Sequence, residues 1–318
     1  MGEYRISIIV PVYNAQNHIK KCVDSIIRQI TDIDEILLIN DGSKDNSEVI
    51  LREYEKKYSN IRVRSKDNEG VAKTRNLGIQ EAKGKYICFI DNDDFIDQNY
   101  FEIFMNVAED GYDIVIGGYR RVEAEKIRFE VTPTDTAWYK YIITAPWAKI
   151  YRRQFLIDND IKFLNYGLGE DIYFSIVAYS CTNKIKTINY IGYNWYFNEE
   201  SVSNTSQRGF NATLDPVYLL ERIYQRVGTE NEEYSYFYVR YGIWYLLFSG
   251  RNAQYNDFIR EYYNIFSWYR KNDIKEKFPI LSSKTKGEKA SVKLVIKSFL
   301  LIHKVKCVKL FARFYCKG

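Results

Sequence analysis

The sequence predicts an α/β protein, with a mainly parallel sheet flanked by helices and a helical appendage at the C-terminal end. Strand-like apolar runs alternate with helical patterns through the first hundred residues, which is typical of βαβ units. The runs are continuously apolar, as expected for strands covered on both faces. Beyond about residue 208 the pattern is helical and aromatic, without further strand and turn alternation.

The first hundred residues contain four predicted strands, each followed by polar residues. Apolar runs predict these strands at 6–13, 35–41, 61–66 and 86–91. Helical periodicity predicts the intervening helices at 17–29, 47–58 and 71–83.

The following hundred residues mix both patterns. Helices are predicted at 99–109, 146–160 and 170–181, and strands at 113–122, 126–131 and 184–197. A change of pattern near residues 204–209 then predicts three parts of the chain: a catalytic domain at 1–208, a helical domain at 209–285 and a basic amphipathic tail at 286–318.

Composition excludes several classes of protein. The 46 basic and 41 acidic residues give a net charge of only +5, too balanced for a nucleic-acid-binding protein. No apolar run reaches about 20 residues, so no membrane-spanning helix is expected. The first residues indicate a strand rather than a signal peptide. The five cysteines form no CxxC pair, which favours reduced thiols and a cytoplasmic location.

Polar residues gather where three predicted strands end. Pro11, Tyr13 and Asn14 follow the first strand, Asp41 and Gly42 the second, and the run 91–94 the fourth. Because the carboxyl ends of parallel strands meet at one edge of the sheet, these residues predict a ligand site there.

The run 91–94 concentrates carboxylates. In an extended chain, Asp91 and Asp93 point the same way and can share a divalent cation with a preference for hard oxygen ligands, Mn²⁺ or Mg²⁺. The alternative is a helix cap, with Asp94 or Asp97 capping a helix that begins near Asn99.

Five motifs in order carry a family resemblance. They are SIIVPVYN, EILLINDGSKDNS, DNEGVAKTRNLG, GKYICFIDNDD and LGEDIYF, spread over residues 5 to about 203. Together they resemble the family 2 glycosyltransferases with the GT-A fold. The resemblance implies a metal-dependent, inverting enzyme that moves one sugar from a UDP-sugar to a hydroxyl of a growing glycan, carried on lipid or protein. The QxxRW motif of the family's processive synthases does not occur, which predicts non-processive hexosyl transfer.

The resemblance also assigns site residues. Asp93 would bind the metal directly, and Asp91 would contact both the metal and the ribose. Asp41 would belong to the nucleotide site, and the alternative is that it only forms an ordinary turn. Arg75 is expected near the diphosphate, and the alternative is that it lies on a solvated helix face. The positions matching the nucleotide site are Pro11, Tyr13, Asn14, Asp41, Asp67, Asn68, Arg75 and Asp91.

A catalytic base is expected from the pair Glu170 and Asp171. The only histidines, His18 and His303, lie in an early helix and in the tail, so a carboxylate must serve. By resemblance, Asp171 deprotonates the acceptor hydroxyl, and Glu170 contacts or orients the acceptor. Trp147 is a further expected acceptor contact, and burial against Trp147 or Tyr173 would raise the pKa of the catalytic base. The alternative is that both acids only stabilise a helix N-terminus.

Residues 193–203, YNWYFNEESVS, resemble the segment that closes over the diphosphate. Phe197 and Asn198 stand where the family often has Arg or His.

The tail is strongly basic. No acidic residue follows Glu288, and the periodicity predicts two amphipathic pieces with a break near 304–306. Such a surface favours peripheral contact with an anionic membrane at its inner face. Packing on the other helices, self-association into a homo-oligomer and a solvated terminus are the alternatives. The cations are Lys289, Lys293, Lys297, Lys304, Lys306, Lys309, Arg313 and Lys317.

Three other functions compete with glycan extension. A polyprenyl-phosphate sugar synthase would use the same donor site. A sugar nucleotidyltransferase would need a glycine-rich basic loop after the first strand, where VPVYNAQN stands instead. A non-catalytic scaffold would bind a nucleotide-sugar or partner subunits without needing Asp91, Asp93 or Asp171.

Overall fold

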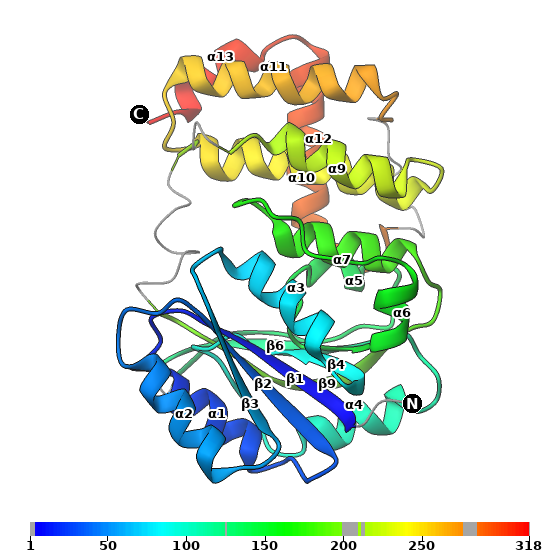
Figure 1. Ribbon diagram of the computed structural model, residues 1–318. Coiled ribbons are helices and arrows are strands. Elements are labelled where there is room, and N and C mark those ends of the chain that lie inside the picture. The colour runs from blue at the N-terminus through cyan, green and yellow to red at the C-terminus, as the bar shows by residue number, and fades with distance from the viewer. Residues whose placement is uncertain (1–3, 125, 199–208, 211–213, 276–284, 318) are drawn as a thin grey trace. The chain divides into compact units, whose positions relative to one another are not determined.

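The computed structural model describes residues 4–124, 126–198, 209–210, 214–275 and 285–317 (Figure 1). It divides into two compact units. The sheet unit comprises Met1–Asp135, Thr144–Tyr166 and Glu170–Asn198, and the helical unit comprises Thr136–Ile143, Gly167–Gly169 and Glu199–Gly318. The predicted boundary at 204–209 lies almost entirely outside the described residues.

A nine-stranded mixed sheet organises the sheet unit and confirms the predicted α/β class. Its strand order is β3-β2-β1-β4-β8-β6-β9-β5, with β7 paired to β6. Strands β3, β2, β1 and β4 are mutually parallel, so their carboxyl ends lie at one edge, whereas β8 runs antiparallel to β4 and to β6. The strands are β1 Tyr4–Val12, β2 Asp34–Asp41, β3 Ile61–Lys66, β4 Gly84–Phe89, β5 Phe95–Ile96, β6 Ile114–Glu123, β7 Lys126–Val131, β8 Lys149–Arg152 and β9 Ile185–Tyr196.

Helices cover both faces of this sheet. Figure 1 shows α1 and α2 on one side and α3 on the other, as right-handed crossovers require for this strand order. Gly78 lets α3 pack directly on the sheet, because a Cβ there would lie 2.5 Å from Cγ2 of Ile9. The helices are α1 Ile19–Ile27, α2 Ser47–Lys57, α3 Val71–Glu81, α4 Tyr100–Ala108, α6 Arg153–Asp158 and α7 Glu170–Ser180.

One predicted element is wrong. Residues 146–160 do not form a single helix, because strand β8 precedes α6. Ile150 and Tyr151 are 1% and 0% exposed, since β8 is hydrogen-bonded to β4 on one side and to β6 on the other. These long-range pairings override a helical pattern. The two-residue strand β5 was also not predicted.

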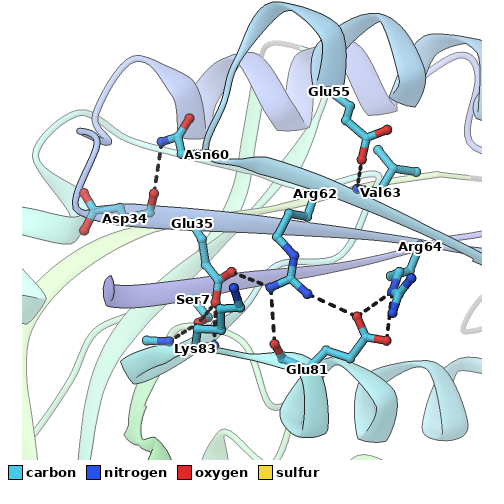
Figure 2. Close-up of polar contacts among 11 residues, drawn as sticks. Ser7, Asp34, Glu35, Glu55, Asn60, Arg62, Val63, Arg64, Glu81 and Lys83 are labelled. Atoms are coloured by element: carbon cyan, nitrogen blue, oxygen red, sulfur yellow. Dashed lines mark hydrogen bonds and ion pairs between the residues drawn. The ribbon is translucent and has the colours of Figure 1, made fainter. Parts of the chain in front are cut away.

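Buried acids at the amino ends of the strands form a separate, structural network (Figure 2). The carboxylate of Glu35, 0% exposed, accepts hydrogen bonds from Ser7 Oγ at 2.5 Å, the Lys83 amide at 2.6 Å and Arg62 Nη1 at 2.9 Å. Arg62 in turn contacts Glu81 at 3.3 Å. Because every bond is supplied within the sheet unit, Glu35 is tolerated in the core.

The helical unit has an aromatic core. Helix α10 packs against α9, α11 and α12, and Tyr238 and Tyr269 are fully buried between them. Gly242 makes room for the Tyr269 hydroxyl, which donates to the Tyr238 carbonyl at 2.9 Å. No helix in the described ranges is long and apolar enough to cross a membrane. The helices are α5 Tyr139–Ile142, α9 Pro216–Val227, α10 Glu232–Gly250, α11 Tyr255–Lys271, α12 Ala290–Lys304 and α13 Val308–Tyr315.

Candidate active site

The acidic turn, defined as residues 91–94, follows β4 at the carboxyl edge of the sheet. Its shape is fixed by hydrogen bonds to neighbouring strands. Asn92 Nδ2 donates to the Pro11 carbonyl at 2.8 Å. The Tyr193 hydroxyl accepts from the Asp91 amide at 3.2 Å and donates to Asp94 Oδ2 at 2.6 Å. The turn therefore presents its carboxylates in a set arrangement.

The helix-cap alternative is wrong. Asp94 is 1% exposed and bonded to β9, where the Tyr196 amide donates to its Oδ1 at 2.8 Å. Asp97 accepts from Arg120 and Asn194, at 2.8 and 2.7 Å. Asn99 occupies the N-cap of α4, without a side-chain capping bond.

Asp91 and Asp93 are suited to a cation. Arg75 Nη2 donates to Asp91 Oδ1 at 2.7 Å and Asn198 Nδ2 to Asp93 Oδ2 at 3.3 Å. The second oxygen of each carboxylate accepts no hydrogen bond from another described residue. Burial, and then the charge of Asp91, raises the pKa of Asp93, so a cation would relieve a real electrostatic cost.

Two carboxylates alone make an incomplete coordination shell. Among the described residues, no group of three or more His, Cys, Asp or Glu side chains is placed to hold a metal ion. That composition fits Mn²⁺ or Mg²⁺, because such ions are commonly held by one or two carboxylates together with substrate phosphates.

Arg75 links the acidic turn to α7. It is 5% exposed, and besides Asp91 it contacts Glu170 Oε1 through Nη1 at 3.3 Å. Burial acts to lower the pKa of Arg75, but attraction to Asp91 and Glu170 outweighs it and raises that pKa. The solvated-face alternative for Arg75 is therefore wrong. Its predicted contact with a diphosphate stays a prediction.

Glu170 and Asp171 form the first turn of α7. Burial and the neighbouring Glu170 charge raise the pKa of Asp171 to about 7, against the opposing effects of the Ile172 amide and Arg75. The Ile172 amide donates to Asp171 Oδ1 at 2.8 Å. A carboxylate with a pKa near neutrality suits a general base. An acid that only stabilised the N-terminus of α7 would not need a raised pKa.

Lys149 is a charged residue that the sequence reasoning missed. It lies on β8, is 0% exposed, and donates to the Ala145 carbonyl. Burial lowers the pKa of Lys149 to about 7, and the charge of Asp171 acts in the opposite direction. The available clue was a lysine inside the apolar run WAKIY. Lys149 and the candidate base Asp171 therefore lie close enough for their charges to interact.

The loops after β1 and β2 are bound to each other. Asn14 has a left-handed backbone, φ 47°. Its amide donates to Ser43 Oγ at 3.0 Å, and its Oδ1 accepts from the Lys44 amide at 2.8 Å. Pro11 is buried and Tyr13 is 47% exposed. Tyr13 is therefore the residue of this loop whose ring is available to a ligand.

Asp41 organises the loop after β3. Its carboxylate accepts from Lys66 and from the amides of Glu69 and Gly70, both at 2.9 Å. Burial raises the pKa of Asp41, but these donors outweigh it and lower the pKa overall. Asp41 does more than form a turn, since it fixes the loop that carries Asp67 and Asn68.

That loop lies close to the end of β2. Asp67 and Asn68 are both exposed. A Cβ on Gly42, φ +71°, would lie 2.8 Å from the Asn68 amide nitrogen. The predicted nucleotide residues of β1, β2 and β3 are thus neighbours at one edge.

Trp147 lies within an aromatic cluster. It is 8% exposed and stacks on Tyr193, with ring centroids 4.6 Å apart at 5°. Because Tyr193 binds the acidic turn, Trp147 supports that turn from behind. Its predicted contact with an acceptor is untested.

Comparison with known proteins shows what the chain is similar to. The sequence profile described as Glycosyl transferase family 2 matches residues 7–164. Glycosyltransferase GlyA of Streptococcus pneumoniae is 28% identical over 233 residues, 66% of this chain and 33% of that protein. Poly(ribitol-phosphate) beta-glucosyltransferase of Bacillus spizizenii is 32% identical over 204 residues, 61% of this chain and 32% of that protein. The chain thus spans about a third of these two relatives.

The fold has solved counterparts. The crystal structure of S. aureus TarS 1–349 in complex with UDP-GlcNAc is similar with a TM-score of 0.59 and 20% identity, covering 90% of this chain and 98% of that one. This likeness confirms the predicted GT-A fold. The profile match over residues 7–164, about half of the chain, shows that the chain belongs to the family 2 glycosyltransferases.

Proposed function

We propose that this chain transfers one sugar from a UDP-sugar to a hydroxyl of a growing glycan, with inversion at the anomeric carbon. The observation that carries the proposal is a continuous polar chain at the carboxyl edge: Asp91 contacts Arg75, Arg75 contacts Glu170, and Glu170 precedes Asp171. Donor-side and acceptor-side carboxylates are thereby held in one arrangement.

The residues have distinct roles. Tyr13 and Asp41 flank the nucleobase of the donor, and Asp91 and Asp93 would hold Mn²⁺ or Mg²⁺. When bound, such an ion supplies Lewis-acid stabilisation of the departing diphosphate. Asp171 removes the proton of the acceptor hydroxyl, and Glu170 orients that hydroxyl. A single base acting once predicts direct displacement and therefore inversion.

The testing experiment measures UDP release from UDP-Glc, UDP-Gal, UDP-GlcNAc and UDP-GalNAc, with and without Mn²⁺. We expect slow, Mn²⁺-dependent release from one donor in water alone, and faster release with a glycan acceptor. Acceleration by polyprenyl phosphate instead would support the lipid-sugar synthase, and pyrophosphate release would support a nucleotidyltransferase. Absence of turnover for every donor would contradict the proposal.

Lys149 gives a prediction about pH. With Asp171 as base, kcat/KM should rise as pH increases through about 7, because the deprotonated carboxylate is the active form. The charged groups around it are Glu170, Arg75 and Lys149. Lys149→Met removes a nearby positive charge, so the midpoint of the kcat/KM profile should move to higher pH.

Lys162→Met, at a side chain 65% exposed, is the matched control and should leave the midpoint in place. The kcat/KM profiles would be recorded from about pH 5.5 to 9, a range that brackets the raised pKa expected for Asp171. An unchanged midpoint in folded Lys149→Met would contradict the role of Lys149.

We also propose that α12 and α13 dock on an anionic membrane from the cytoplasmic side. The predicted break near 304–306 is present between these helices. Phe299 is buried at 2%, whereas Val295, four residues earlier on the same side of α12, is 50% exposed. Large apolar side chains thus remain exposed among the tail cations, a combination typical of interfacial helices. They are Leu294 at 64%, Val295 at 50%, Leu301 at 61%, Val305 at 55%, Leu310 at 55% and Phe314 at 83%.

Vesicle binding tests this docking. The protein should bind vesicles containing phosphatidylglycerol and not pure phosphatidylcholine. Lys309→Gln with Arg313→Gln should weaken binding about 30-fold, since each cation near the surface contributes about 1 kcal/mol. Lys56→Gln with Lys57→Gln, on α2, is the charge-matched control. Self-association without vesicle binding, detected by sedimentation, would contradict the membrane assignment and favour a homo-oligomer.

A further inference from the structure

Arg121, on β6, is a buried guanidinium without an anionic partner. The residue is 6% exposed, and its Cζ lies 3.6 Å from the centroid of the Trp195 ring. In the part of the chain that the structure describes, its side chain has no hydrogen bond or ion pair, and Nη1 is buried without a partner. A buried charge in this state is costly, and a guanidinium does not escape the cost by losing its proton.

The nearby carboxylates of Asp94 and Asp93 bond to residues other than Arg121. The oxygens of Asp94 accept from the Tyr193 hydroxyl and the Tyr196 amide, and Asp93 accepts from Asn198. Burial lowers the pKa of Arg121, and the negative charges of Asp94 and Asp93 oppose that shift. The two carboxylates are therefore close enough to interact with the guanidinium. Arg121 therefore lies near the acidic turn without forming a salt bridge to it.

The neighbouring Arg120, on the same strand, shows the partners that a structural arginine has there. Arg120 contacts Asp97 at 2.8 Å, Glu130 at 3.1 Å and the Ile191 carbonyl at 3.0 Å. Its charge is matched within the sheet unit. The contrast indicates that the partner of Arg121 comes with a ligand.

The chemistry of that partner follows from the guanidinium. Its planar fork of donors fits the oxygens of a phosphate. Contact with the Trp195 ring holds the guanidinium in place, and among the described residues Nη1 is the one nitrogen of this group that is both fully buried and unpartnered. Phe197, directly after β9, has its ring centroid 5.1 Å from Cζ and adds an apolar wall.

The strand order gives the position of the phosphate. The residues proposed to contact the nucleobase lie at the ends of β1 and β2. The acidic turn follows β4, and Arg121 lies further along the sheet on β6. A nucleoside diphosphate that begins at β1 and β2 reaches the acidic turn with its phosphates. Its end distal to the nucleoside then lies toward β6.

We propose that Arg121 binds the distal phosphate of the nucleoside diphosphate, the one bonded to the donor sugar. The assignment rests on the proposed function, because it takes a nucleotide-sugar as donor. Arg121 would neutralise charge on that phosphate as the glycosidic bond breaks. Arg75, whose terminal nitrogens both contact carboxylates, is less available for the task.

Calorimetric titration with UDP, UMP and inorganic pyrophosphate, all with Mn²⁺, tests the assignment. Wild-type protein should bind UDP more tightly than UMP. Arg121→Gln should weaken UDP binding about 10- to 100-fold, the usual loss for a hydrogen-bonded charge, and leave UMP binding unchanged. Arg121→Lys should fall between, because it keeps the charge and loses the fork. Arg120→Gln is the matched control, and UMP binding verifies that each variant is folded.

The outcomes separate this assignment from the proposed function. If Arg121→Gln keeps the full preference for UDP over UMP, the assignment is overturned while UDP binding stands. If wild-type protein binds pyrophosphate but not UDP, the proposed donor is wrong, and a loss of pyrophosphate binding in Arg121→Gln still supports the phosphate contact. If it binds neither, both fail.

Discussion

Asp171→Asn is expected to lower sugar transfer by about 10²- to 10⁴-fold, the usual contribution of a positioned general base. The amide keeps the shape of the side chain and cannot accept the acceptor proton. The affinity for UDP should stay within about twofold, because Asp171 lies on α7, whereas the predicted nucleotide residues lie at or just after the ends of β1 to β4 or, for Arg75, on α3. Steady-state transfer rates and UDP titration would be measured on the same preparation.

Asp158→Asn serves as the control for that experiment. Asp158 ends α6 in the same unit and is exposed, and its Oδ1 accepts a hydrogen bond from Gln154 Nε2 at 2.6 Å. It should transfer sugar at the wild-type rate. A folded Asp171→Asn variant with undiminished turnover would refute the base assignment and leave the scaffold alternative standing for retesting.

Asp93→Asn should have the second large effect. Removing this carboxylate should lower Mn²⁺-dependent UDP release by about 10²- to 10³-fold, since a bound ion contributes several kcal/mol to stabilising developing charge. Chelation of wild-type protein should reproduce the loss, and added Mn²⁺ should restore wild type but not the variant. UDP release with and without chelator is the measurement.

Asp110→Asn, an exposed acid just beyond α4, controls for loss of one negative charge. If chelator leaves wild-type turnover unchanged, the cation has no role and Asp93 must act differently. A variant that loses activity yet responds to Mn²⁺ as wild type does would point to a purely structural Asp93.

Short sequence patterns correctly predicted the elements whose structure is determined by their own residues. The first four strands are confirmed because continuous apolar runs and polar strand ends are encoded within each segment. The GT-A fold and the family followed from motifs such as GKYICFIDNDD. The placement of Asp41 and Asp91 at one edge followed from parallel strands alone.

The features that were missed depend on residues distant in sequence. Strand β8 exists because β4 and β6 provide partners on both sides, which no window around residue 150 contains. Lys149 reads as one polar residue in an apolar run until burial is known. Arg121 and Arg120 are adjacent and alike in sequence, and only the contacts from Asp97 and Glu130 distinguish them.

Arg75 has one more consequence, for the order in which substrates add. A donor that engages Asp91 competes for the carboxylate that Arg75 holds at 2.7 Å, so the arginine shifts its attraction toward Glu170, now 3.3 Å away. Under the proposed function, the acceptor side would then be complete only after the donor has arrived. Ordered sequential kinetics with the nucleotide-sugar as leading substrate should result, and product inhibition by UDP, competitive toward donor and not toward acceptor, would reveal it.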